Sequence, residues 1–278
     1  MPLANLRDVS LCYETLGRRG DPAIVMIRGL GTQLIEWSPM LLDGLAGGGL
    51  EVVVFDNRDA GLSSEMNGAA GTPPYRLEDM AGDVVGLLDH LRIERAHVFG
   101  ISMGGMIAQH VAIAHPQRCR SLISVMSSTG NPDLPSPSAQ MRARLVESAD
   151  TPEALIALNA ENRAVFGSPA YPESLQERVA AARSAYQRSH RPAGVARQMQ
   201  AVIADGSRVA RLRMLAVPTL VIHGAEDPLI PLAAGRDAAA VIPGARLEVV
   251  PGMGHNIPDA LAARITDVLL RFVRALPL

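Results

Sequence analysis

Short apolar segments recur along the chain and favour β-strands. They are residues 24–27, 51–55, 97–99, 122–126, 219–222 and 247–250. Their apolar positions are nearly continuous, so we expect strands buried on both faces, as in a parallel sheet covered by helices. Before the first of them, Val9, Leu11 and Tyr13 alternate with polar residues. This alternation predicts an antiparallel edge strand with one face in water.

Segments with helical spacing lie between these strands. Apolar residues recur at intervals of three and four between Leu77 and Leu91, and residues 106–115 and 260–273 are also typical of helices. Strands that alternate with helices indicate an α/β fold with a mostly parallel central sheet and helices on both faces.

The alternation of predicted strands and helices stops after Gly130. Three prolines within residues 131–137 predict a loop, and no strand-like segment returns before Pro218. Thr151 followed by Pro152 has the pattern of a helix N-terminus. One face of a further helix is predicted by Leu175, Val179, Ala182 and Tyr186. The sequence therefore predicts a core of residues 1–130 and 214–278, with an all-helical cap, residues 131–213, over the carboxyl edge of the sheet.

A candidate nucleophile lies in the pattern Gly100-x-Ser102-x-Gly104, which directly follows one predicted strand and precedes a helix. A serine at such a sharp turn adopts a strained backbone, and the glycines allow close approach of neighbouring chain. The helix N-terminus also favours a developing negative charge. Glycine and serine are common in ordinary tight turns, so it is the placement between strand and helix that predicts a catalytic role.

A serine hydroxyl needs a base and an orienting acid, which in this arrangement follow it in the order acid, histidine. Asp227 and His255 fit this order, because each follows a predicted strand at the edge where parallel sheets bind ligands. The alternatives are Glu226 for the acid and His223 for the base. His223 precedes the acid, and Asp227 precedes a proline that favours an extended backbone, so we expect Asp227 and His255.

An oxyanion hole requires two backbone N–H groups. The candidates are Met103, directly after the nucleophile, and Leu30, in the loop Arg28-Gly29-Leu30-Gly31 after a predicted strand. This loop also resembles part of a dinucleotide-binding motif, but Leu34 stands where the third glycine is required. Trp37 and the predicted cap residue Phe166 are candidates for the substrate pocket, although buried aromatic residues more often pack in a core.

Composition narrows the chemistry further. The formal charge is −2, and no basic stretch indicates a nucleic-acid or membrane-surface partner. All 26 basic residues apart from histidine are Arg, which excludes mechanisms that depend on lysine, such as Schiff-base formation. Cys12 and Cys119 match no metal or redox spacing, and no histidine pair forms a recognised metal motif. No secretory signal or membrane-length apolar segment is present. We expect a cytoplasmic enzyme without metal or cofactor, acting on a small-molecule ester.

Several segments together resemble the α/β-hydrolase superfamily, and within it bacterial carboxylesterases of the aclacinomycin methylesterase group. The matching segments are residues 27–31, 55–63, 79–83, 96–105, 218–224 and 251–255. The resemblance implies ester hydrolysis through an acyl-enzyme at Ser102, with Asp227 and His255 completing a triad and Met103 and Leu30 supplying the oxyanion donors. Many relatives have a histidine where this chain has Arg28, so the hydrogen bonds around the oxyanion loop are expected to differ.

Other activities use the same triad. A perhydrolase, a lactonase and a carbon–carbon bond hydrolase all remain open, because no motif in the predicted cap encodes the substrate. A serine nucleophile argues against a dehalogenase or epoxide hydrolase, which resemble this fold but carry Asp at that position. A ligand-binding protein that lost its activity is less compatible, because all three triad positions are intact.

Overall fold

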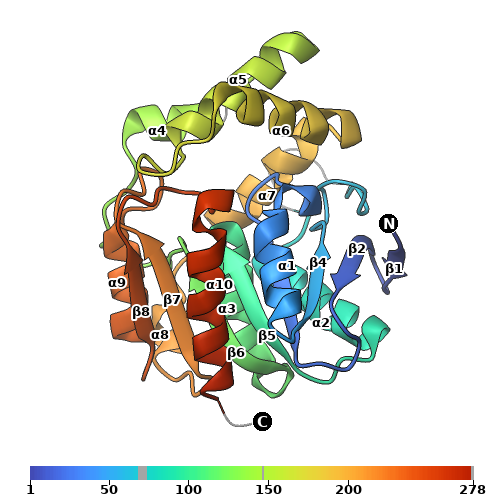
Figure 1. The fold of residues 1–278 in the computed structure, drawn as a ribbon, viewed down its shortest axis with the longest axis vertical. Coiled ribbons are helices and arrows are strands. Elements are labelled where there is room, and N and C mark those ends of the chain that lie inside the picture. The colour runs from blue at the N-terminus through green and yellow to red at the C-terminus, as the bar shows by residue number, and fades with distance from the viewer. Residues whose placement is uncertain (68–73, 146, 277–278) are drawn as a thin grey trace.

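An eight-stranded sheet forms the centre of the computed structural model, which describes residues 1–67, 74–145 and 147–276. The strands lie in the order β1-β2-β4-β3-β5-β6-β7-β8 (Figure 1). Their bounds are β1 Leu3–Asn5, β2 Ser10–Leu16, β3 Ala23–Ile27, β4 Glu51–Phe55, β5 Ala96–Ile101, β6 Cys119–Val125, β7 Thr219–Gly224 and β8 Arg246–Val250. The pairs β1–β2 and β2–β4 are antiparallel, and the strands from β4 to β8 are parallel.

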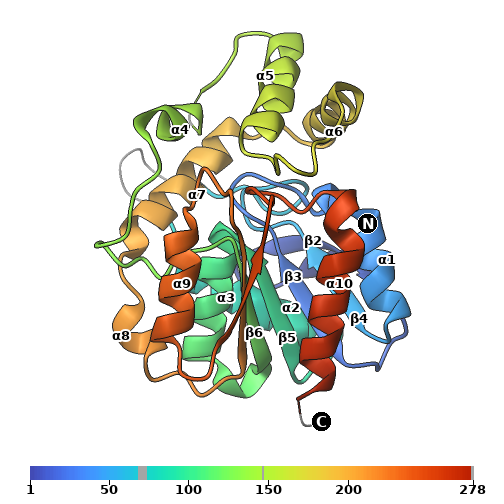
Figure 2. The same ribbon diagram turned by 60° about the vertical axis from the view of Figure 1, so that its left-hand side comes forward.

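Helices cover both faces of this sheet. Helices α1 (Pro39–Gly47) and α10 (Asp259–Arg274) pack together on one face, and α2 (Leu77–Leu91) and α3 (Met103–Ala114) pack together on the other. Helix α9 (Leu232–Val241) packs on β7 and β8 (Figure 2). Successive β3 residues point to opposite faces, so Ile24 and Met26 join the core under α1 and α10, while Val25 and Ile27 join the core under α2 and α3. This two-sided burial explains why the strands are continuously apolar.

The sequence patterns predicted this sheet closely. All six apolar segments are strands of a mostly parallel sheet, so the expected α/β class is confirmed. The expectation of an edge strand at Val9–Tyr13 was partly wrong: β2 is antiparallel, but β1 pairs along its outer side. The three residues of β1 are too short a segment for an alternating pattern to reveal.

Between β6 and β7 the chain is helical. The elements are α4 (Ala139–Arg144), α5 (Pro152–Val165), α6 (Leu175–Arg188), α7 (Pro192–Asp205) and α8 (Val209–Leu212). We call residues 139–205, which hold α4 to α7, the helical insertion. The hydroxyl of Thr151 caps α5 by accepting the Ala154 N–H at 3.2 Å, as the threonine-proline pattern predicted. Figures 1 and 2 both place α5 and α6 beyond one end of the sheet.

Two details of this helical stretch differ from the sequence pattern. Leu175 is 65 % exposed, so only Val179, Ala182 and Tyr186 of the predicted face pack against α5. Helix α8 lies against α3, and Leu212 is buried in the core cluster on that face of the sheet. Within the described ranges, the structure contains no helix long and apolar enough to cross a membrane.

Candidate active site

Ser102 occupies the turn between β5 and α3 with a left-handed backbone, φ 54° and ψ −123°. Such a conformation is strained for a residue with a side chain and persists only where the surroundings enforce it. Here the Ser102 N–H donates to the carbonyl of Val125 at 3.0 Å, and the Ser102 carbonyl accepts the hydroxyl of Ser127 at 2.8 Å. The backbone N–H and the carbonyl of Ser102 are therefore both held by residues at the carboxyl end of β6.

The two glycines of the motif are required by close backbone approach. A Cβ atom on Gly100 would collide with the Gly104 carbonyl, and one on Gly104 would collide with the Ile27 carbonyl. Gly29 lies beside Ser102, because a Cβ placed on it would be 3.7 Å from Oγ of Ser102. The loop after β3 thus runs directly past the serine.

Asp227 and His255 form a hydrogen-bonded pair at the ends of β7 and β8. Nδ1 of His255 lies 2.7 Å from Oδ2 of Asp227, and the Asp227 side chain is fully buried. Oδ1 of Asp227 accepts the N–H groups of Leu229 and Ile230 at 2.9 and 2.8 Å. Because the carboxylate can only accept, Nδ1 carries the proton and Nε2 of His255 is left as a base.

The alternative residues occupy different environments. Glu226 is exposed, whereas Asp227 is 7 % exposed. Nε2 of His223 donates to the Ile230 carbonyl at 2.8 Å and is 3.8 Å from Oδ2 of Asp227. Burial lowers the pKa of His223, so its ring is neutral and packs behind the Asp227 loop. The arrangement favours Asp227 and His255 over both alternatives.

The predicted oxyanion loop is a tight turn. The Thr32 N–H donates to the Gly29 carbonyl at 3.4 Å, and Gly31 has φ +67° at the third position of the turn. This geometry matches a turn that requires a positive φ at that position. Among the described residues, neither the Leu30 nor the Met103 N–H donates a hydrogen bond outside regular helix or strand bonding. Among the side-chain hydrogen bonds of the described residues, the His255 ring bonds Asp227 and none joins it to Oγ of Ser102, a link that often tightens only with substrate.

Arg28 and Trp37 pack together below this turn. The Arg28 guanidinium lies 4.6 Å from the centre of the Trp37 ring and donates to the Glu36 carbonyl at 3.2 Å. Burial lowers the pKa of Arg28 to about 10. Trp37 is 3 % exposed and contacts Phe99 edge-on, so most of its ring lies in the core. A pocket role for Trp37 or Phe166 stays a prediction.

Sequence patterns gave no signal for several polar residues that support this region. Ser127 contacts the Ser102 carbonyl, Ser168 contacts the His255 loop, and Gln198 contacts the Leu30 loop. The last two lie in the helical insertion, 86 and 167 positions away from their partners along the chain. Such long-range pairs leave no local spacing to recognise.

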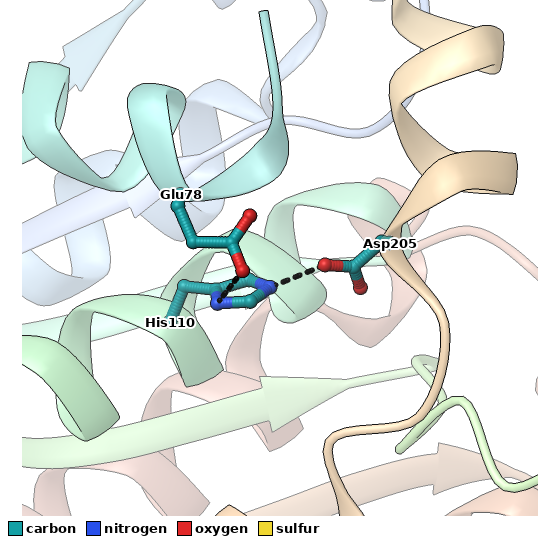
Figure 3. Close-up of side chains that lie close together, drawn as sticks. All are labelled: Glu78, His110 and Asp205. Carbon is teal, nitrogen blue, oxygen red and sulfur yellow. Dashed lines mark hydrogen bonds and ion pairs between the residues drawn. The ribbon is translucent and has the colours of Figure 1, made fainter.

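A separate cluster joins Glu78, His110 and Asp205 from α2, α3 and α7 (Figure 3). Nε2 of His110 lies 2.6 Å from Oδ1 of Asp205 and Nδ1 lies 3.5 Å from Oε1 of Glu78. Arg208 and Arg211 pair with the same two carboxylates. Burial, and then Arg208, lower the pKa of His110 to about 4. Two acids matched by two arginines are typical of an ion-pair network rather than a metal site.

A cavity of about 490 Å³ opens at the opposite edge of the sheet, lined by Leu50, His97, Arg120 and Pro218 among others. His97 and Pro218 precede or begin their strands, whereas Ser102, Asp227 and His255 follow theirs. This cavity is therefore separate from the candidate active site.

A doubly wound sheet with a serine at a strand-to-helix turn and an acid–histidine pair at the ends of later strands is typical of the α/β-hydrolase class. Residues 22–259 match the alpha/beta hydrolase fold family. The chain belongs to this family, and it is a hydrolase.

Several named relatives match nearly the whole chain. The 3-oxoadipate enol-lactonase 2 of Acinetobacter baylyi is 32 % identical, over 96 % of this chain and 95 % of its own. The rhodomycin D methylesterase DnrP of Streptomyces peucetius is 28 % identical, over 96 % of each. The crystal structure of the enol-lactonase from Burkholderia xenovorans superposes with a TM-score of 0.81 at 27 % identity, covering 98 % of this chain and all of the other. The methylesterase confirms the resemblance seen in the sequence.

Proposed function

We propose that the protein hydrolyses carboxylic esters through an acyl-enzyme on Ser102. The observation that carries this proposal is the strained backbone of Ser102 at the start of α3, together with the buried Asp227–His255 pair at the same edge of the sheet. In this proposal His255 is the general base, Asp227 orients it, and the N–H groups of Met103 and Leu30 bind the oxyanion.

The geometry supports the following sequence of steps. Oγ of Ser102 attacks the ester carbonyl carbon while Nε2 of His255 takes the hydroxyl proton. The carbonyl oxygen becomes an oxyanion at the N–H groups of Met103 and Leu30, each worth about 3 kcal/mol of barrier when preorganised. The intermediate collapses, the C–O bond breaks, and the alcohol leaves with the proton from His255. Water activated by His255 then attacks the acyl-enzyme, which releases the acid and restores Ser102.

Lactone hydrolysis is the second candidate, and the identity to two enol-lactonases favours it. A lactone is a cyclic ester, so the steps at Ser102 are the same, but the alcohol stays attached to the acyl group. A linear ester instead releases a separate alcohol before water attacks. Parallel assays with enol lactones and with linear enol esters of the same acids, whose leaving groups have similar acidity, decide between them: a higher kcat/KM for the lactone favours a lactonase, and a higher kcat/KM for the linear ester favours an esterase.

We also propose that the helical insertion, which makes up most of the predicted cap of residues 131–213, acts as a cap over this site, whereas α8 belongs to the core. The support is the contact of the α5–α6 connection with the His255 loop, where the His255 N–H donates to the Phe166 carbonyl at 2.7 Å. The cap is expected to select the ester. Replacing Phe166 with Ala tests its predicted pocket role: a pocket residue changes the ranking of esters by acyl length, and an unchanged ranking contradicts the role.

A further inference from the structure

Helix α7 of the insertion holds the turn that contains Leu30. Gln198 on α7 is fully buried. Its Oε1 accepts the Gly31 N–H at 2.8 Å, and its Nε2 donates to the Arg58 carbonyl at 2.7 Å. Each end of the amide therefore meets the backbone partner it requires, so a side chain without both a donor and an acceptor cannot make the same two bonds.

The bond to Gly31 fixes the direction of one peptide. In a four-residue turn the central peptide can face either of two ways, which distinguishes turn types I and II. Here that peptide joins Leu30 and Gly31, and its N–H points at Gln198. Val195, also on α7, packs against the same glycine, since a Cβ on Gly31 would be 2.9 Å from Cγ2 of Val195. Helix α7 thus holds the peptide that follows Leu30, and it acts on the Leu30 N–H, which belongs to the preceding Gly29–Leu30 peptide, through the conformation of the whole turn.

A second part of the insertion holds the loop that contains His255. The hydroxyl of Ser168, which follows α5, accepts the Gly254 N–H at 3.0 Å and donates to Oδ1 of Asn256 at 2.6 Å. Ser168 is 3 % exposed, so these bonds are shielded from water. The residues on both sides of His255 are therefore tied to one buried side chain of the insertion.

We propose that Gln198 and Ser168 are positioning residues, so that the insertion is a structural part of the catalytic centre and not only a cover. Gln198 fixes the oxyanion turn and Ser168 fixes the histidine loop. This inference rests on the proposed roles of Leu30 and His255. A shift of about 1 Å in a catalytic group can lower the rate about a hundredfold, so loss of either contact is expected to slow ester hydrolysis.

Gln198→Met tests the first contact, because methionine has a similar length but makes neither hydrogen bond. We expect kcat for a p-nitrophenyl ester to fall about tenfold to a hundredfold, with KM changed less than about threefold. The inhibition constant of an alkyl boronic acid, whose tetrahedral adduct places an oxygen in the oxyanion hole, is expected to rise by the same factor as kcat/KM falls.

Gln33→Met is the matched control. Gln33 is also buried and also joins the core to the insertion, donating to the carbonyls of Ala185 and Ser189 at 2.7 and 3.0 Å. We expect it to lower the melting temperature but to leave kcat and boronic acid binding close to wild type. Equal effects of the two variants on kcat and on boronic acid binding would overturn the role of Gln198.

Gln198→Glu gives an independent readout if the methionine variant does not fold. A protonated glutamic acid can donate to the Arg58 carbonyl as the amide does, whereas the carboxylate repels it. The kcat of this variant, divided by the wild-type kcat at the same pH, is expected to rise as the pH falls. A ratio independent of pH would contradict the proposal.

Ser168→Ala tests the second contact. We expect kcat to fall about tenfold with little change in KM, and Ser168→Thr, which keeps a hydroxyl, to restore part of the loss. Ser174→Ala removes an exposed serine of the same insertion that caps α6 through the Glu177 N–H, and it is expected to leave kcat unchanged. Equal kcat values for Ser168→Ala and wild type would refute the role.

Failure of the proposed function can be distinguished from failure of the positioning roles. If a fluorophosphonate does not label Ser102 of the wild-type protein, the assignment of the nucleophile is wrong. If it labels Ser102 but Gln198→Met and Ser168→Ala keep wild-type kcat, only the positioning roles are wrong.

Discussion

At the scale of single residues, three side chains that are far apart in sequence carry the proposed chemistry, and each depends on its immediate neighbours. Ser102 is held in a left-handed conformation by bonds to β6 and Ser127. Asp227 accepts two backbone N–H groups besides His255, which orients the carboxylate toward Nδ1 of the ring. His255 is 9 % exposed in its side chain, so the pair is largely shielded from water.

His255→Ala is expected to lower kcat for a p-nitrophenyl ester by at least about a thousandfold, because the variant has no base for the serine proton. His223→Gln keeps a donor for the Ile230 carbonyl and is expected to change kcat less than about tenfold. Steady-state kinetics on both purified variants measures the difference. The reverse order would exchange the roles of the two histidines.

Comparing Asp227→Asn with Glu226→Gln tests which of these two neighbouring acids orients His255. An asparagine amide can present its NH₂ to the ring and favour the wrong tautomer of His255, so we expect a loss of about a thousandfold or more in kcat. Glu226→Gln changes an exposed side chain and is expected to stay within about twofold of wild type. A large loss in the glutamine variant alone would move the acid to Glu226.

At the scale of secondary-structure elements, close contact between β3 and the start of α3 positions Ser102, the proposed nucleophile. Gly104 lies against the Ile27 backbone, so Gly104→Ala forces two main-chain segments apart. We expect a loss of about 1–3 kcal/mol or more in the free energy of unfolding. Gly82→Ala is the control: Gly82 lies in α2 with open space at its Cβ position, so alanine is expected to stabilise by about 0.5–1 kcal/mol. Chemical denaturation that ranks the variants the other way would contradict this packing.

Element type and order could be predicted from the sequence because buried parallel strands are continuously apolar and because apolar residues of α2 recur at intervals of three and four. Boundaries were harder: β5 extends to Ile101, beyond the apolar segment at residues 97–99, since pairing with β6 continues past it. The three proposed triad residues could be named because each lies in the loop at the carboxyl end of a strand: Ser102 directly follows β5, Asp227 lies three residues after β7 and His255 five residues after β8. Gln198 and Ser168 could not, because their partners are brought near only by tertiary packing.

At the scale of the whole molecule, ion pairs join the helical insertion to the core. Arg188 of α6 pairs with buried Asp56 at 2.7 Å, and Arg197 of α7 pairs with buried Asp59 at 2.7 Å. The network of Figure 3 adds a hydrogen bond between the neutral ring of His110 and Asp205 at the end of α7. Since the side chains of Asp56 and Asp59 are fully buried, breaking either ion pair leaves an uncompensated buried charge. The insertion is therefore fastened to the core along α6 and α7.

Acid is expected to destabilise the whole fold through buried histidines. Burial, and then Arg120, lower the pKa of His97 to about 4, below the ordinary value of about 6.5. The unfolded chain then binds a proton that the folded protein does not, so this contribution is complete above about pH 6.5 and is lost as the pH falls toward 4. His97→Gln is expected to reduce the loss of unfolding free energy between pH 7 and pH 5 by about 2 kcal/mol.

Chemical denaturation at the two pH values measures this difference. Replacing the exposed His90 with Gln is the matched control, and it is expected to retain the wild-type dependence. An unchanged dependence in His97→Gln would show that His97 is not buried in its neutral form.

The proposed role of Ser102 as nucleophile is tested most directly by labelling with a fluorophosphonate, followed by mass spectrometry of the digested protein. The phosphonyl group is expected on Ser102 alone, with release of fluoride. Ser102→Ala is expected to remain unlabelled while keeping the wild-type circular dichroism spectrum, and His255→Ala to react at least about a thousandfold more slowly. Labelling of a different residue, or an unlabelled wild-type protein, would contradict the assignment of Ser102.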